Sequence, residues 1–137
     1  LRELCRRLSE RFRVAVADER YEIAACSGGA PRFRIGQCDV MSGGKKRETI
    51  PMLLRAMSPQ ILAVDEITEE EDCKSLLSCL GCGCQLLATA PGSTLADLTR
   101  RPAYQSLLAA GAFRQVILIQ TQEGRRSYAL QPMPQVL

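Results

Sequence analysis

The sequence predicts an α/β domain with a mainly parallel sheet and flanking helices. Short runs rich in Val, Ile and Leu alternate along the chain with segments whose apolar residues recur at helical spacing. The apolar runs end at charged or turn-forming residues, which is typical of strands buried on both faces. Strands that alternate with helices form right-handed crossovers, and these produce a parallel sheet.

The first elements follow from local patterns. A helix is expected over residues 1–12, and a buried strand over residues 11–18. Residues 26–44 are rich in Gly, Ser and Pro and are expected to form a loop, with at most a brief extended piece at 33–35. Residues 45–57 carry apolar side chains at helical spacing, and Pro59 ends that helix because it lacks an N–H donor.

The second half of the chain repeats the alternation. In chain order we expect a strand at 60–66, a helix at 69–81, a strand at 84–90, a helix from Ser93 or Thr94 that Pro102 divides, a strand at 115–121 and a last strand at 127–131. The acidic residues at the start of the 69–81 helix suit the positive end of its dipole. No internal repeat interrupts this order.

Length and composition fit one ordinary globular domain. The chain has 137 residues, 46% of them hydrophobic, and 18 basic against 15 acidic residues give a net charge of +3. This balance neither requires nor excludes an anionic partner, and aromatic residues at 4% do not support stacking on single-stranded nucleic acid. No apolar run approaches the roughly 20 residues of a membrane span, so a cytoplasmic location is expected.

Cysteine usage indicates reduced thiols. The chain has seven cysteines, an odd number, and no other sign of secretion. Cys73, Cys79, Cys82 and Cys84 lie close together, and their spacing invites a zinc or iron–sulfur interpretation. The favoured interpretation is structural, because cysteine packs as a small apolar residue at a helix end and in a buried strand. Metal binding and redox sensing remain as alternatives.

Polar residues follow three of the predicted strands. Asp18 and Glu19 follow the first, Asp65 and Glu66 end the second, and Thr89 ends the third. Ligands of doubly wound sheets bind beyond the carboxyl ends of the strands. Carboxylates and a hydroxyl at that rim are typical of metal-assisted phosphoryl transfer, although an Asp-Glu pair alone could simply cap a helix.

A phosphate-binding loop is not found in the sequence. Such a loop needs the pattern G-x-x-x-x-G-K-[ST]. The segment at 42–48, SGGKKRE, fails it, because Lys46 stands in place of Ser or Thr and Asp39 stands where the first glycine belongs.

Several segments resemble one family. The stretches VADERYEIAAC, MSPQILAVDEITEEED, LLATAPGSTLADL and RPAYQSLLAAGAFRQVILI are similar to the stage III sporulation protein AA family of endospore-forming bacteria, over residues 1 to about 120. The family consists of P-loop ATPases similar to the secretion ATPases and the AAA group. The resemblance implies a RecA-like or AAA-type core, ATP and Mg²⁺ as cofactors, and a homo-oligomer, in the form of a ring, that energises a membrane-embedded, secretion-like channel between mother cell and forespore.

The resemblance also assigns roles to residues. Asp65 would complete the Mg²⁺ shell through water, and Glu66 would be the catalytic base of a Walker B motif. An acidic box would comprise Asp18, which contributes to cofactor binding, with Glu19 and Glu22 as further catalytic candidates. Thr89 would be the sensor that contacts the nucleotide.

The resemblance further implies that residues 1–137 are the C-terminal part of one ATPase core domain. In the family, the glycine-rich loop lies just before a helix like that of residues 1–12, and its strand lies between those at 84–90 and 115–121. We therefore expect these residues to lack the P-loop strand, to be inactive alone, and to be poorly stable or aggregate.

Two departures from the family pattern leave an alternative open. Pro91 stands where the family has His, and Gln37 and Cys38 stand where it carries an Arg before the Asp-Val pair. Either change could weaken catalysis. The alternative function is a non-catalytic interaction module of the same fold, which binds partner subunits without turnover.

Overall fold

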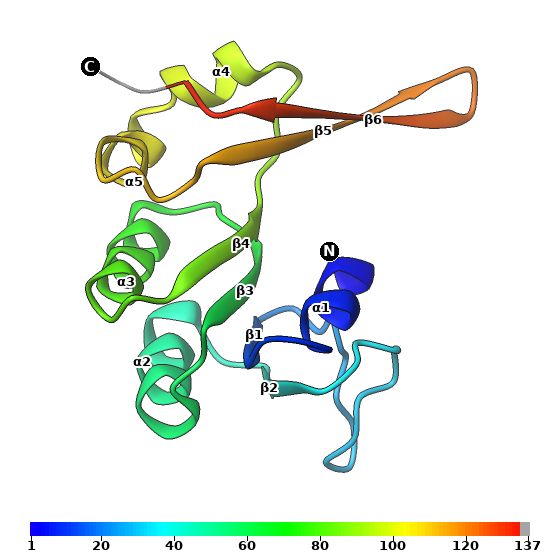
Figure 1. The fold of residues 1–137 in the computed structure, drawn as a ribbon, viewed down its shortest axis with the longest axis vertical. Coiled ribbons are helices and arrows are strands. Elements are labelled where there is room, and N and C mark those ends of the chain that lie inside the picture. The colour runs from blue at the N-terminus through cyan, green and yellow to red at the C-terminus, as the bar shows by residue number, and fades with distance from the viewer. Residues whose placement is uncertain (135–137) are drawn as a thin grey trace.

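The computed structural model describes residues 1–134 as a layered α/β structure with a projecting hairpin (Figure 1). The helices are α1 (Arg2–Leu8), α2 (Lys46–Met57), α3 (Glu70–Gly81), α4 (Leu95–Arg100), the 3₁₀ turn η1 (Pro102–Tyr104) and α5 (Gln105–Ala109). The strands are β1 (Val14–Asp18), β2 (Cys38–Ser42), β3 (Ile61–Glu66), β4 (Gln85–Thr89), β5 (Gln115–Gln122) and β6 (Arg125–Pro132).

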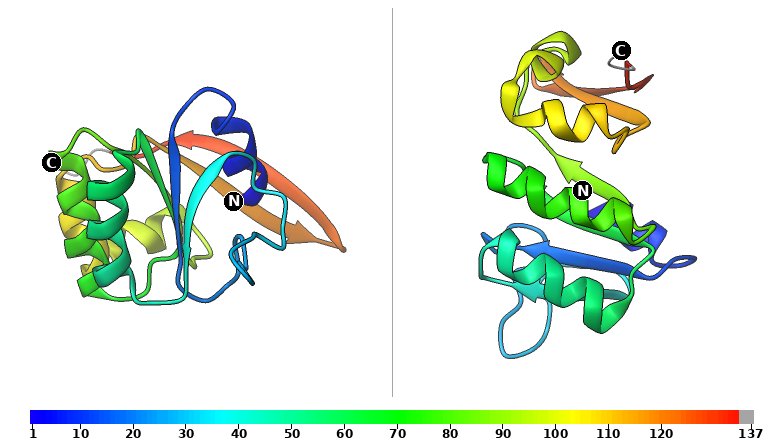
Figure 2. Two further views of the ribbon diagram at one scale, coloured as in Figure 1. Left: turned by 90° about the horizontal axis from the view of Figure 1, so that it is seen from below. Right: turned by 90° about the vertical axis from the view of Figure 1, so that its left-hand side faces the viewer.

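The predicted α/β fold with a mainly parallel sheet is confirmed. Four strands form a parallel sheet in the order β2-β1-β3-β4. Helices α2 and α3 cover one face of this sheet, α5 packs beside α3 on the same side, and α1 lies on the other face (Figure 2). Because all four strands are parallel, their carboxyl ends lie along the same edge of the sheet.

The two central strands are buried on both faces, as their continuous apolar runs predict. Ala15, Leu62 and Val64 pack with the buried side chains of α2, α3 and α5. The alternate side chains, Val16 and Ala63 among them, pack with Cys5 of α1 on the opposite face.

The prediction of a loop throughout residues 26–44 is wrong at its end. Residues Cys38–Ser42 form β2, which pairs in register with the whole of β1. The strand lies at the edge of the sheet, and its side chains are exposed or only half-buried. A half-exposed edge strand lacks the apolar signal of a central strand, and its pairing depends on β1, which lies far away in sequence.

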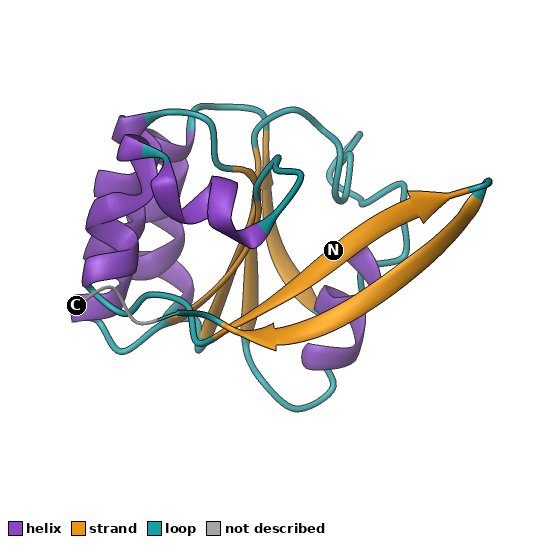
Figure 3. Cartoon of the chain, turned by 90° about the horizontal axis from the view of Figure 1, so that it is seen from above, coloured by secondary structure: helices purple, strands orange, loops and turns teal. Residues whose placement is uncertain are grey.

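The last two strands form an antiparallel hairpin apart from the parallel sheet. In the described part of the chain, β5 pairs only with β6, and β4 has no strand beyond it. Figure 3 shows the hairpin extending past the edge of the parallel sheet. That a further strand lies between β4 and β5, as the family resemblance implies, stays a prediction.

Candidate active site

The carboxyl ends of β1, β3 and β4 bring the predicted site residues to one edge. β1 ends at Asp18, β3 ends at Glu66 and β4 ends at Thr89. Glu66 and Thr89 are direct neighbours in the pairing of β3 with β4. The predicted convergence of acidic groups and a Thr hydroxyl at this edge is therefore present in the fold.

A bulge redirects the end of β3. The register of β3 against β4 shifts between Val64 and Glu66, so Asp65 is an extra residue in the ladder. Val64 faces α2 and α3. Strict alternation would place Asp65 on the α1 face, yet its carboxylate lies at the start of α2. Bulges commonly re-aim side chains beside active sites, and this one turns Asp65 toward the helices.

Lys46, the first residue of α2, lies at the centre of three carboxylates. Its Nζ is 2.8 Å from Asp65 Oδ1, 3.0 Å from Glu19 Oε2 and 3.8 Å from Asp72 Oδ2. We call Glu19, Asp65 and Asp72 the carboxylate cluster. The side chain of Lys46 is only 4% exposed and that of Asp65 only 3%. A buried charge is tolerated when it is paired in this way.

The pKa shifts in the cluster follow from this pairing. Burial by itself lowers the pKa of Lys46. The carboxylates of Asp65 and Glu19 raise it by more than burial lowers it, so the pKa lies above its ordinary value. Burial raises the pKa of Glu19, and the hydrogen bond and charge of Lys46 bring it below its ordinary value. Both groups are therefore charged at neutral pH.

Arg20 connects the remaining acidic residues. Its guanidinium lies 2.8 Å from Glu66 and 3.3 Å from Glu22, and its backbone N–H donates to Asp65 Oδ2 over 3.2 Å. Glu66 is half-buried and Glu22 is exposed. The acidic box that follows β1 is thus joined to the end of β3 by one arginine.

Asp18 organises the loop that carries this box. Its two carboxylate oxygens accept hydrogen bonds of 2.8 to 2.9 Å from the backbone N–H groups of residues 22–25. Ser42 of β2 donates a further hydrogen bond over 3.2 Å. The side chain is fully buried. These contacts explain why an acid is needed at the end of β1, and the predicted role of Asp18 in cofactor binding stays a prediction.

Thr89 and the two departures lie at the surface. Thr89 is exposed, and its carbonyl accepts a hydrogen bond from the Ile67 N–H. In the pairing of β3 with β4, Thr89 is the backbone partner of Glu66 at the rim. Pro91 and Gln37 are also exposed, in the segments after β4 and before β2.

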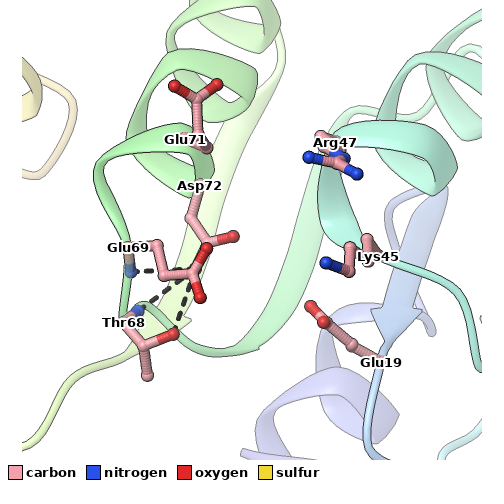
Figure 4. A pocket seen from close by; sticks show the side chains of 7 residues that line it. All are labelled: Glu19, Lys45, Arg47, Thr68, Glu69, Glu71 and Asp72. Carbon is pink, nitrogen blue, oxygen red and sulfur yellow. Dashed lines mark hydrogen bonds between the residues drawn. The ribbon is translucent and has the colours of Figure 1, made fainter.

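A small pocket opens between the starts of α2 and α3 (Figure 4). One wall is lined by Glu19, Lys45 and Arg47, and the other by four residues at the start of α3, Thr68, Glu69, Glu71 and Asp72. Asp72 accepts hydrogen bonds from the backbone N–H groups of Thr68 and Glu69, which holds the second wall in place. The pocket measures about 50 Å³. Ligand sites typically measure roughly 300 Å³ or more, so this pocket alone is too small for a nucleotide.

The residues present fit one part of a magnesium–nucleotide site. Carboxylate oxygens suit the hydrated shell of Mg²⁺. Within the described residues, the buried Oδ1 atom of Asp65 accepts no hydrogen bond of regular geometry, and its one charged contact is the ion pair with Lys46. No three His, Cys, Asp or Glu side chains of residues 1–134 are arranged to hold a metal directly. A phosphate-binding loop is absent from the 137 residues.

Three members of the site received no role from the sequence. Lys46 and Asp72 were missed, and Arg20 was expected only as a polar residue after the first strand. Lys46 carried a usable signal, because Lys46, Ile50 and Leu53 recur at helical spacing on the buried face of α2. Asp72 likewise precedes buried Leu76 by one turn. Arg20 carried no such signal, because its partner Glu66 is distant in sequence.

The cysteines pack as the structural interpretation expects. Cys73, Cys79 and Cys84 are buried in the core beneath α3, and Cys82 is exposed at the end of that helix. The arrangement favours cysteine as a small apolar core residue.

Comparison with known proteins places this site in a family context. The family model described as sporulation stage III, protein AA matches residues 2–128. Stage III sporulation protein AA of Bacillus subtilis (strain 168) is 35% identical over 113 residues, which cover 82% of this chain and 37% of the relative. The chain therefore spans just over a third of the length of that curated relative.

A solved structure shares the fold at low sequence identity. The pilus retraction motor PilT, crystallised with bound ADP, superposes with a TM-score of 0.50 and 12% identity, covering 98% of this chain and 51% of that one. This likeness shows a fold in common with part of a pilus retraction motor. Since the family model and the relative both match most of the chain, the chain belongs to the sporulation stage III, protein AA family.

Proposed function

We propose that this chain forms part of an ATPase core that hydrolyses ATP with Mg²⁺ in a sporulation apparatus. The observation that carries the proposal is the position of Asp65 and Glu66 at the carboxyl end of a central parallel strand. Lys46 and Arg20 form ion pairs both with these two residues and with the acidic residues after β1. The PilT motor was crystallised with ADP, and its fold is shared here. Mg²⁺ would supply charge stabilisation at the phosphates.

Each residue has a defined task in this proposal. Asp65 contacts the hydration shell of the metal, since its carboxylate is fixed at the end of β3. Glu66 is the base that orients and deprotonates water, and Glu19 and Glu22 are the alternative bases. Thr89, adjacent to Glu66, contacts the terminal phosphate. Asp18 supports the site by holding the 22–25 loop.

The phosphate-binding loop is proposed to come from polypeptide outside these 137 residues. The chain covers 37% of its Bacillus subtilis relative, and it contains no G-x-x-x-x-G-K-[ST] pattern. We propose that residues 1–137 are the C-terminal part of one core domain and that the strand of the missing loop fits between β4 and β5. Within residues 1–134, β4 and β5 each have one edge that pairs with no other strand, which supports that arrangement.

The assembly is proposed from the family. We propose a homo-oligomer, in ring form, that works against membrane-embedded sporulation channel proteins. Between residues 1 and 134, no helix is both long and apolar enough to cross a bilayer.

A non-catalytic interaction module is the second candidate. The departure at Pro91 favours it, because the exposed segment after β4 carries Pro91 where the family pattern has His, close in sequence to the predicted sensor Thr89. A module of this kind would bind partner subunits and never turn over ATP.

Calorimetric titration with magnesium–ATP separates the two candidates. Residues 1–137 alone would be compared with the same chain carrying its natural flanking residues. We expect binding by the longer protein only, because the phosphates need a loop that these 137 residues lack. Binding by neither protein would favour the interaction module, and binding by the shorter protein alone would place the nucleotide elsewhere.

Substitution of Glu66 by Gln tests the base. In the longer protein, Glu66→Gln should abolish turnover and leave magnesium–ATP affinity within about threefold, since the amide keeps the shape but cannot accept a proton. Glu10→Gln is the matched control, because Glu10 is exposed and pairs with Arg6 away from the site. Retained turnover in Glu66→Gln would move the base to Glu19 or Glu22.

A further inference from the structure

Lys46 occupies a position that its contacts mark as more than a surface charge. It is the first residue of α2, and its side chain is 4% exposed. The other two lysines of the sequence are exposed. Lys45 lies at the rim of the pocket, and the side chain of Lys74 on α3 is 59% exposed. A lysine is rarely buried to this extent unless carboxylates surround it.

The ammonium joins three elements that carry the site. Asp65 comes from the end of β3, Glu19 from the loop after β1, and Asp72 from the first turn of α3. Without a cation between them, these carboxylates would repel one another in a partly buried space. Lys46 therefore keeps the ends of two strands and two helices at a fixed separation.

The contacts also fix the orientation of the Asp65 carboxylate. Oδ1 faces the Lys46 ammonium at 2.8 Å, and Oδ2 accepts from the Arg20 backbone N–H at 3.2 Å. Because two different segments of the chain each hold one oxygen, the Asp65 carboxylate cannot rotate freely and keeps one orientation. Groups that hold a metal-contacting carboxylate in this way set its geometry and basicity.

We propose that Lys46 is a positioning residue of the nucleotide site, which holds the carboxylate cluster together and orients Asp65 toward the hydrated metal of the bound nucleotide. This inference rests on the proposed ATPase function. The ammonium acts through Asp65, and Lys46 itself is assigned no contact with the nucleotide.

The first test needs no nucleotide. A double-mutant cycle would measure unfolding by denaturant in the protein with its natural flanking residues, for Lys46→Met, Asp65→Asn and the double variant. We expect coupling of about tenfold in the unfolding equilibrium constant between the two positions. The sign should make Asp65→Asn less harmful, or favourable, once Lys46 is Met. Coupling below about twofold would overturn the proposal.

The second test measures the magnesium dependence of turnover at saturating ATP. Lys46→Met should raise the half-saturating Mg²⁺ concentration about 10- to 100-fold, as loss of a group that orients a metal-contacting carboxylate does. Lys46→Arg should have an intermediate effect, because it keeps the charge and changes the geometry. Lys74→Met, which removes the same charge at an exposed site, should leave the value unchanged.

The outcomes separate this inference from the function it rests on. A merely structural lysine would lower the melting temperature and the active fraction without changing the half-saturating Mg²⁺ concentration, and that result would overturn the positioning role. If Lys46→Met does not fold, Lys46→Arg decides by the same readout. Absence of turnover in the unsubstituted protein would overturn the ATPase function and the positioning role together.

Discussion

Asp18 illustrates how one side chain can hold a functional loop. Its oxygens accept hydrogen bonds from four consecutive backbone N–H groups, those of residues 22–25. The loop needs this support, because Tyr21 and Ala25 have left-handed backbones with φ of 58° and 50°. The arrangement fixes the path of Glu19, Arg20 and Glu22 toward the end of β3.

Asp18→Asn should destabilise the protein by about 2 to 4 kcal/mol, because the amide points a donor at backbone N–H groups that need acceptors. Denaturant unfolding measures the change. Asp39→Asn is the matched control, since Asp39 is exposed on the neighbouring strand β2 and should cost less than about 0.5 kcal/mol. Equal effects of the two substitutions would contradict this account.

The same carboxylate predicts a dependence of stability on pH. Burial raises the pKa of Asp18, but the four backbone N–H groups outweigh it and bring the pKa below its ordinary value of 3.8. The unfolded chain therefore binds more protons in acid, and stability falls as pH drops. The contribution is complete above the unfolded pKa and is lost as pH falls through the lower pKa of the folded state.

Unfolding measured from about pH 7 to about pH 2 should show this loss in the unsubstituted protein and a smaller loss in Asp18→Asn. The difference in unfolding free energy between the two proteins should narrow as the pH falls below 3.8. A difference that stays constant over the whole range would show that Asp18 does not titrate with folding.

Among the elements, α2 depends on an unfavourable residue at its end. Ser58 follows the last helical residue with φ of 44° and ψ of 54°, in the left-handed region, and its N–H donates to the Leu54 carbonyl. Glycine is the residue that usually occupies this position after a helix. The helix must end here so that the chain can turn through Pro59 into β3.

Ser58→Gly should stabilise the protein by about 0.5 kcal/mol, because relief of the left-handed strain exceeds the added freedom of the unfolded chain. Ser78→Gly, the same substitution inside α3, should destabilise it by about 0.5 kcal/mol. Thermal unfolding of both variants provides the comparison. Destabilisation by Ser58→Gly would mean that the serine makes a contact that its backbone geometry does not reveal.

Two cysteines of helix α3 and Cys84, just before strand β4, are buried, which predicts their reactivity. Burial raises the pKa of Cys79 to about 12 and also raises that of Cys84. Cys82 is exposed between them. In the native protein, an aromatic disulfide reagent should modify Cys82 rapidly and Cys79 and Cys84 only after unfolding. Cys82→Ser should remove a rapid phase, and rapid modification of Cys79 would contradict the core position.

At the scale of the whole molecule, the hairpin of β5 and β6 exposes large apolar side chains, whereas those of the central strands are buried. Ile117 lies opposite Leu130 and Ile119 opposite Tyr128, so the four share one face. The last three of these are between 60% and 66% exposed. An exposed apolar face beside the unpaired edge of β5 is a site for association with other chains.

Residues 1–137 alone are therefore expected to self-associate. Ile119→Lys should raise the monomeric fraction several-fold, because a charge on the apolar face opposes edge-to-edge pairing. Gln120→Lys is the matched control on the opposite face of the same strand and should change the fraction little. Light scattering after size-exclusion chromatography gives both values. A fully monomeric chain would contradict the prediction that the exposed face of the hairpin causes self-association.

The sequence by itself determined the central strands and the acidic residues at their ends. β1 and β3 each begin with four consecutive apolar residues, as strands buried on both faces do, and they end at Asp18 and at Asp65 and Glu66. The apolar run and the acidic residues at its end are adjacent in the sequence, so both could be predicted from it. Helices α2 and α3 likewise follow from local periodicity.

Only the tertiary structure decided how the site is held together. β2 gains its strand conformation from β1, Lys46 is buried by carboxylates from three other segments, and Arg20 finds Glu66 across 46 positions of sequence. The bulge at Asp65 exists only because β3 pairs with β4. Contacts between distant segments leave no periodic trace in the chain, so the acidic residues were predictable, and the cations that organise them became visible only in the fold.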